Sequence, residues 1–234
     1  MTELIAIRHG ETDSNREHRF QGQLDVPLNA TGRLQAERLA ERLADEPVDA
    51  AWVSDLQRAQ QTAAPWAARR GAVMQPDARW REQSFGRIEG MQVKALHRDH
   101  PELWVRWAEH DADFALPEGE SARQFHARIL GALQALGQAH PRERVLLVTH
   151  GGVLDMLWRT ATGASLHGPR ACAIPNAGIN RLRWDGERLE VLTWADDAHL
   201  AGLPVQPSTV PLSVRLKELG AAALTADDAE PPVP

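Results

Sequence analysis

Two short segments of the chain place a histidine and a glycine directly after an apolar run. Residues 4–7 lead into Arg8-His9-Gly10, and residues 145–148 lead into Thr149-His150-Gly151. A glycine at such a point lets the backbone turn sharply and approach a ligand closely. A lone histidine at a strand end is more often structural. The repeated arrangement nevertheless indicates a site at which two histidines meet an oxyanion.

A third segment adds a second cation to this site. Ser54 follows the apolar run 50–53, and Arg58 lies in the first turn of the helix expected next. A cation in the first turn of a helix is unfavourable because it opposes the helix dipole. Together with Arg8, Arg58 therefore suggests a site in which two arginines bind an anion. One guanidinium group can donate two parallel hydrogen bonds to the oxygens of a phosphate group. From the residues alone, the pattern predicts an anion-binding domain whose chemistry extends to phosphoryl transfer.

These side chains need strands and helices to position them. Strand-like runs alternate with helical patterns, and they occupy residues 4–7, 50–53, 73–74, 145–148, 179–184 and 189–194. This alternation predicts a three-layer α/β/α fold with a mainly parallel, mixed sheet of about six strands. The last two runs surround Asp185-Gly186, a strong hairpin signal. Open sheets of this kind bind ligands at their carboxyl edge, where His9 and His150 would both lie.

Helix boundaries give three local predictions. Ser54 stands at the N-cap position of a helix that begins near Leu56. Pro65 is expected to kink or end that helix. Ser121 and Gln124 form a capping-box pattern before an apolar helix.

Composition restricts the class of protein. The chain of 234 residues has a formal net charge of −6 and one cysteine, Cys172. An acidic chain has no bulk field for nucleic acid or an anionic membrane, and no run approaches the ~18 apolar residues of a membrane span. The N-terminus lacks the pattern of a signal peptide. We therefore expect a cytoplasmic protein that binds neither nucleic acid nor a membrane.

Six motifs, in order over about residues 3–195, resemble those of the histidine phosphatase, or phosphoglycerate-mutase-like, superfamily. Arg8–Asn15 resembles the RHGxTxxN signature of that family. The other similar segments are Phe20-Gln21-Gly22, Ser54–Thr62 (SDLxRAxxT), Arg81–Gly90 (RExxFGxxEG), Leu116–Ser121 (LPxGES) and Thr149–Gly152. One such string arises by chance, whereas the ordered set is specific.

The resemblance implies a phosphohistidine mechanism in the phosphatase branch of the family, with no metal and no cofactor. His9 would be the nucleophile, in its neutral form. Arg8, Arg58 and His150 would hold the non-bridging phosphoryl oxygens. Glu82 would protonate the leaving alkoxide and then activate water.

The resemblance also suggests residues that bind the substrate. Asn15 is similar to a family position that contacts the phosphoryl group, and Gln21 and Gly22 belong to the substrate-loop motif. Gly151 opens a helix whose first N–H groups favour an anion. Asn176 lies where the family brings a loop back to the site, and it is a further candidate for a substrate contact.

Other polar residues have competing interpretations. Glu89 lies in the same block as Glu82, but capping of a loop is the simpler role for it, and Glu11 is expected to orient backbone groups. His97 and His100 match a metal pair by spacing only. We expect no metal at that pair.

The family contains several functions, and the sequence favours one. A phosphatase that acts on a small phosphorylated metabolite is the main prediction. The alternatives are a 2,3-bisphosphoglycerate-dependent phosphoglycerate mutase and a non-catalytic phosphate-binding domain. Classical mutases carry a longer insertion after the Glu block and a tyrosine, whereas this chain has no tyrosine, and lysine only at positions 94 and 217.

The chain is expected to divide into a domain and a tail. Residues 1–200 would form the histidine phosphatase domain, with about 83–120 as a small helical cap that sets specificity. Residues 201–234 would form a proline-rich tail, in which a short helix at Ser213–Leu224 is one expectation. A monomer or a homodimer is expected.

Overall fold

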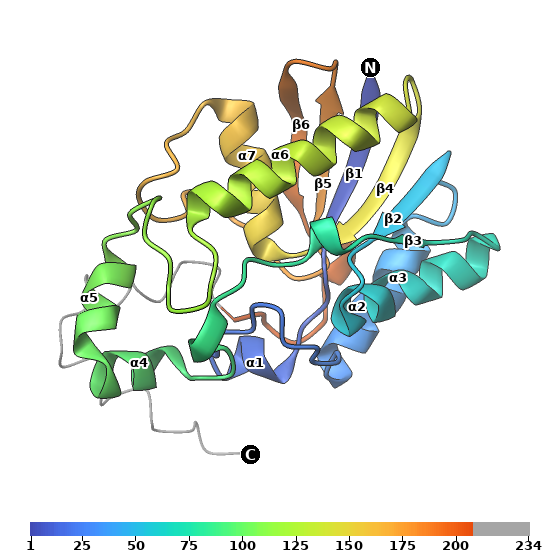
Figure 1. Ribbon diagram of the computed structural model, residues 1–234. Helices are drawn as coiled ribbons and strands as arrows, with labels where there is room; N and C mark the ends of the chain where they lie inside the picture. The colour runs from blue at the N-terminus through green and yellow to red at the C-terminus, as the bar shows by residue number, and fades with distance from the viewer. Residues whose placement is uncertain (208–234) are drawn as a thin grey trace.

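A mixed sheet of six strands forms the centre of the computed structural model, which describes residues 1–207. The strand order is β3-β2-β4-β1-β5-β6 (Figure 1). The strands are β1 (Thr2–Arg8), β2 (Ala50–Val53), β3 (Gln75–Pro76), β4 (Arg144–Thr149), β5 (Ile179–Trp184) and β6 (Leu189–Asp196). Strands β1 to β4 pair in parallel, and the β5–β6 hairpin adds two antiparallel strands. The predicted α/β sheet is thus confirmed, while the predicted tail helix at Ser213–Leu224 lies outside the described residues.

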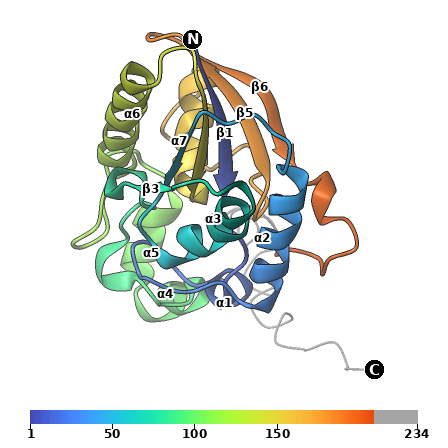
Figure 2. The same ribbon diagram turned by 90° about the vertical axis from the view of Figure 1, so that its right-hand side faces the viewer.

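Helices cover both faces of the sheet and make the fold three-layered (Figure 2). On one face, α6 (Ala122–Ala139) and α7 (Gly151–Thr162) pack their apolar sides on β1 and β4. On the other face, α2 (Ala30–Arg42) and α3 (Gln57–Arg70) pack on the alternate side chains of the same strands. Both central strands are therefore buried on two sides, which explains why they read as continuous apolar runs.

Two of the predictions on local structure need correction. Helix α3 does not end at Pro65 but continues to Arg70. Trp66 is buried and donates its indole N–H to the carbonyl of Leu43; this packing supports the helix where proline lacks a donor. The predicted strand at 73–74 lies instead at Gln75–Pro76, because Val73 is exposed and packs on nothing that would order it.

A small helical cap lies beyond the carboxyl ends of the parallel strands (Figure 1). It contains α4 (Val93–Asp99) and α5 (Pro101–Ala108), and the short helix α1 (Asp13–Arg16) lies beside it. The cap has its own apolar cluster, which includes Phe20, Leu96, Trp104 and Leu116. The capping box predicted at Ser121 and Gln124 is present where the chain leaves the cap for α6. Within residues 1–207, no helix is long and apolar enough to cross a membrane.

Candidate active site

The two histidines lie side by side at the carboxyl edge of the sheet. His9 directly follows β1 and His150 directly follows β4, and the neighbouring strands place Arg8 opposite Thr149. The ring centroids are 5.2 Å apart, and both side chains are buried. The parallel pairing of β1 with β4 thus brings together two residues that are 141 positions apart in the sequence.

His9 is held as a neutral ring with one nitrogen available. Its Nδ1 lies 2.7 Å from the carbonyl oxygen of Gly10, which can only accept, so Nδ1 carries the proton and Nε2 has the lone pair. Burial lowers the pKa of His9 well below its usual value, and the charges of Arg58 and Arg8 lower it further. A neutral imidazole with a free Nε2 is the form that can act as a nucleophile.

His150 is oriented by a serine. Its Nε2 lies 2.7 Å from the hydroxyl oxygen of Ser54, whereas its buried Nδ1 has no partner within the described residues. Ser54 is not the N-cap that the sequence suggested, because Leu56 occupies that position and receives no side-chain cap. Burial lowers the pKa of His150 well below its usual value, with Arg58 as the next cause.

Arg8 and Arg58 bring two positive charges to the histidines. Arg58 donates to the carbonyl oxygens of Gly22 (2.8 Å) and Leu24 (2.7 Å), and Arg8 donates to that of Ile174 (2.7 Å). Burial is the main cause that lowers the pKa of each guanidinium to about 10, so both stay charged at neutral pH. In the part of the chain that the structure describes, the Nε of each is buried without an acceptor. Such donors suit an anion.

Glu82 is anchored at the start of helix α7. Its Oε2 accepts the N–H of Gly152 at 2.9 Å, and its Oε1 accepts the N–H of Gln83 at 2.8 Å. Because α7 begins directly after His150, this anchor fixes the carboxyl group beside the histidine pair. A side chain on Gly152 would collide with it, since a Cβ there would lie 2.1 Å from Oε1.

The residues expected to bind substrate are near the histidines, but several of them bind protein groups. Asn176 donates its amide to the carbonyl of His9 (3.0 Å) and to Oδ1 of Asn15 (3.2 Å). Gln21 accepts from Thr12, and the carbonyl of Gly22 accepts from Arg58. Asn176 and Gly22 therefore position other site residues. With Oδ1 of Asn15 occupied, its amide nitrogen is the group that can donate to a ligand.

Gly151 is the first residue of α7, as expected, and it is buried. A Cβ at this position would lie 3.4 Å from Nε of Arg8 and 3.6 Å from both terminal nitrogens of Arg170. Sequence reasoning missed Arg170, because its segment Pro169–Ala171 matches no motif and arginine is common in this chain. It also missed the contacts of Ser54 and Gly152, although both lie inside recognised motifs.

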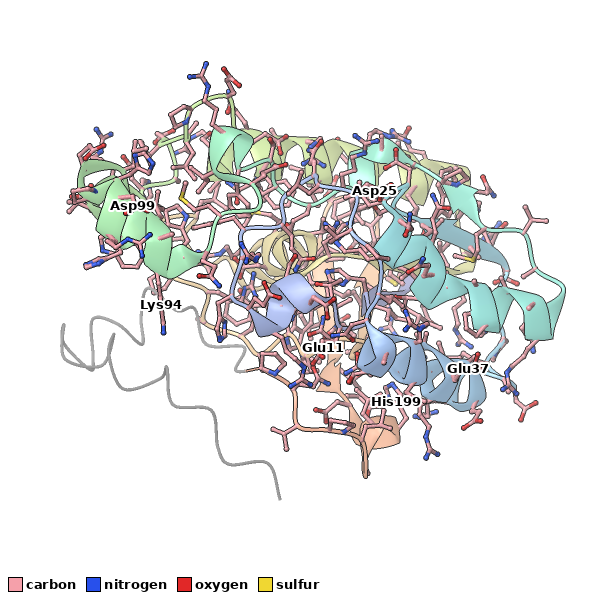
Figure 3. All side chains as sticks on the ribbon, turned by 90° about the horizontal axis from the view of Figure 1, so that it is seen from below. Glu11, Asp25, Glu37, Lys94, Asp99 and His199 are labelled. Carbon is pink, nitrogen blue, oxygen red and sulfur yellow. The ribbon has the colours of Figure 1, made fainter. Side chains whose placement is uncertain are left out.

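The competing carboxylates have structural partners. Glu11 is buried between α1 and α2 (Figure 3) and accepts from Arg16 and Asn29. Glu89 accepts the backbone N–H groups of Gln23 and Phe85. Both therefore hold loops around the site.

The histidine pair suggested as a metal site by spacing lies in the cap. His97 packs edge-on against Trp104, with the two ring centroids 5.1 Å apart. Within residues 1–207, the grouping whose spacing would suit a metal is Asp111, Asp113 and His167. Both oxygens of Asp113 already accept from Arg123.

Fold and site together define the class of protein: an α/β domain with two buried histidines and two arginines at the carboxyl edge of a mixed sheet. The family model of the histidine phosphatase superfamily (branch 1) matches residues 4–197, and the chain belongs to this superfamily.

Curated relatives and solved structures agree with this assignment. The chain is 36% identical over 202 residues to phosphoglycerate mutase-like protein 4 of Arabidopsis thaliana, covering 85% of this chain and 86% of the relative. It is 34% identical over 209 residues to the metal-independent phosphoserine phosphatase of the same plant, covering 87% and 85%. The structure of a mycobacterial glucosyl-3-phosphoglycerate phosphatase superposes with a TM-score of 0.73 at 32% identity, covering 83% of this chain and 99% of that one.

Proposed function

We propose that the protein is a phosphomonoester hydrolase that acts through a phosphohistidine intermediate on small phosphorylated metabolites. The observation that carries this proposal is the neutral His9, whose free Nε2 lies among Arg8, Arg58 and His150. Nucleophile, charge stabilisers and a proton donor then occupy one buried site. A non-catalytic binding domain would need the cations but not the neutral nucleophile or Glu82.

In the first step, the lone pair of His9 Nε2 attacks phosphorus and the P–O ester bond breaks. The departing alkoxide takes a proton from the carboxyl group of Glu82 and leaves as the alcohol. Arg8, Arg58 and His150 interact with the three non-bridging oxygens. The phosphoryl group is now bonded to His9.

In the second step, a water molecule attacks the phosphohistidine. The Glu82 carboxylate takes a proton from this water, the P–N bond breaks, and phosphate leaves while His9 returns to its neutral form. Arg8 and Arg58 supply the positive charge that a metal ion supplies in other phosphatases. We therefore propose that turnover survives treatment with a chelator.

The names of the relatives include both activities. Some are named phosphoserine phosphatases and one structural neighbour is a glucosyl-3-phosphoglycerate phosphatase, whereas others are named phosphoglycerate mutase-like or probable phosphoglycerate mutases. The chain reaches His150 after a short cap with two helices, α4 and α5. We therefore place the chain with the phosphatases.

One assay separates hydrolysis from isomerisation. The purified protein is incubated with 3-phosphoglycerate, and free phosphate and 2-phosphoglycerate are measured in the same sample. If the protein is a hydrolase, free phosphate is the main product from 3-phosphoglycerate or from another phosphate ester in a panel of metabolites. Dominant formation of 2-phosphoglycerate would make the protein a mutase. Absence of turnover with every ester, including an aryl phosphate, would favour the binding domain.

A further inference from the structure

Arg170 brings a third guanidinium to the edge of the candidate site. It lies in the loop between α7 and β5, and its two terminal nitrogens are 3.6 Å from the position of a Cβ on Gly151. Arg8 Nε is 3.4 Å from that same position. The guanidinium groups of Arg8 and Arg170 therefore both lie against the first residue of α7.

The side chain of Arg170 has no protein partner that would explain its position. Its Nε is buried without an acceptor, and it forms no hydrogen bond or ion pair with the described residues. Asp155 is the nearby acid on α7, but it is bound by Arg159 at 3.1 Å. Glu82 and, to a smaller extent, Glu11 offset the charge of Arg8, whereas Arg170 lowers the pKa of Arg8, second only to burial. Two cations this close, one of them without a protein partner among the described residues, favour an anionic ligand.

An open cleft of about 180 Å³ lies beside Arg170. Arg170, Gln83, Phe85, Trp107 and Phe114 contribute to its lining, together with Arg159 and the acids Asp111 and Asp155. Asp155 is paired with Arg159. Gln83 directly follows Glu82, which would protonate the leaving oxygen, so the alcohol part of a substrate would enter this cleft.

We propose that Arg170 binds a carboxylate on the alcohol part of the substrate, so that the preferred substrates are phosphate esters of small hydroxy acids. This inference rests on the proposed function, because it assigns the phosphoryl group to His9 and the alcohol to the cleft. A carboxylate fits the fork of a single unpaired arginine, in two parallel hydrogen bonds. A carboxylate carries one negative charge, which matches the single charge of Arg170. A second phosphate group would carry about two negative charges and would exceed it.

A pair of matched esters tests this assignment by binding alone. O-phosphoserine and O-phosphoethanolamine differ only in the carboxylate. Their Kd values are measured by titration calorimetry on the full chain carrying His9→Ala, which removes turnover. We expect phosphoserine to bind at least about tenfold more tightly, the usual effect of a charged hydrogen bond. Adding Arg170→Met should bring the ratio of the two Kd values close to one.

Two further variants control for nonspecific effects. Arg188→Met removes an exposed arginine from the β5–β6 hairpin and should keep the preference for phosphoserine. Arg170→Lys keeps the positive charge but loses the two parallel donors of the guanidinium group, so we expect an intermediate preference for phosphoserine. This variant also replaces Arg170→Met if that variant does not fold.

Three results would overturn the proposal. They are equal Kd values for the two esters when Arg170 is present, a preference that survives Arg170→Met, and an equal weakening of both esters by that variant. The last result would place Arg170 on the phosphoryl group instead. The proposed function fails separately, when the wild-type protein releases phosphate from no ester, the aryl phosphate included.

Discussion

The contact between Ser54 and His150 shows how a single hydroxyl group can determine the state of a buried ring. Ser54 can donate to His150 Nε2, which leaves the ring proton on Nδ1, the nitrogen without a protein partner. In this tautomer the buried Nδ1 of His150 carries a proton that has no acceptor among the described residues. We therefore expect Ser54 to determine which nitrogen of His150 can donate to a phosphoryl oxygen.

Substitution of Ser54 should therefore affect catalysis more than folding. In Ser54→Ala the ring loses its hydrogen-bond partner, and the loss of one such bond costs about 1 kcal/mol of stability. We expect kcat with an aryl phosphate to fall by about tenfold, as His150 loses its orientation. Steady-state kinetics with a parallel thermal melt measures both effects. An unchanged kcat would show that Ser54 does not orient His150 for the reaction.

The buried histidines also make stability depend on pH. Burial, followed by nearby arginines, lowers the pKa of His9 and His150 in the folded protein. The unfolded chain takes up protons near pH 6.5, and the folded chain does not. The free energy of unfolding should therefore fall as the pH drops below about 6.5, by up to about 1.4 kcal/mol per pH unit for each histidine, until the folded pKa is reached.

Urea unfolding at several pH values between about 7 and 5 measures this dependence. The variant His9→Gln/His150→Gln should lose the part of the slope that these two residues cause. It should retain the part from His126 and His199, whose pKa values are also lowered by burial. Equal slopes for wild type and variant would contradict the assignment.

The sequence indicated which candidate residues lie together better than it indicated their supporting contacts. Arg8 ends β1, His9 and His150 follow strands, and Arg58 lies in the first turn of α3. Such positions are visible in the sequence as changes from apolar to polar residues. Arg170 comes from an irregular loop, and whether such a loop returns to the site depends on tertiary packing.

At the scale of elements, the start of α7 joins the two halves of the site. His150 precedes the helix, Gly151 lies against Arg8, and Gly152 donates to Glu82. A helix N-terminus has free N–H groups that hold an acid side chain. The two consecutive glycines allow the arginines and Glu82 to approach the helix backbone.

Gly152→Ala should therefore damage the site. Its Cβ would lie 2.1 Å from Oε1 of Glu82 and 3.0 Å from the ring of Phe125. We expect at least a tenfold loss of kcat, because a displaced acid no longer meets the leaving oxygen. Gly131→Ala in α6 is the matched control: nothing lies within 4 Å of its Cβ. The control should raise the free energy of unfolding by about 0.5–1 kcal/mol and retain kcat. Equal activities of the two variants would contradict the steric account.

Prediction of the elements failed where tertiary packing outweighed local preference. Proline lacks a backbone donor, so a kink or a helix end at Pro65 was the local expectation. The helix does not end there, because the buried Trp66 packs the next turn of α3 against the core. The position of β3 at Gln75–Pro76 has a similar origin. Its pairing with the backbone of β2 sets the strand, and the apolar residues at 73–74 do not. Long, periodic elements such as α6 were predictable because their apolar spacing reports burial directly.

At the scale of the whole molecule, a cluster of positive charges lies inside an acidic protein. The formal net charge is −6, yet Arg8 and Arg58 act on the two histidines and Arg170 acts on Arg8. Many other arginines form exposed pairs with acids, for example Arg123 with Asp113 and Arg87 with Glu118. Pairs of that kind contribute about 0–1 kcal/mol each. The abundance of arginine is thus mainly a surface property.

The cluster of cations around His9 should link phosphate binding to global stability. A ligand that binds only the folded chain adds about 2.7 kcal/mol to the free energy of unfolding at a hundredfold excess over its Kd, and we predict that inorganic phosphate acts in this way. We expect a clear rise in Tm with phosphate for the wild type and for Arg188→Met. Arg58→Ala should remove most of the rise. A rise that persists in Arg58→Ala would place the phosphate elsewhere on the protein.

The phosphoenzyme itself tests the central claim most directly. The protein is mixed with an aryl phosphate, quenched within the first turnovers, digested and examined by mass spectrometry under conditions that preserve phosphohistidine. We predict one acid-labile phosphoryl group on the peptide that contains His9, and neither this adduct nor comparable turnover in His9→Ala. Hydrolysis by His9→Ala at the wild-type rate, or a phosphoryl group found on another residue, would contradict the account.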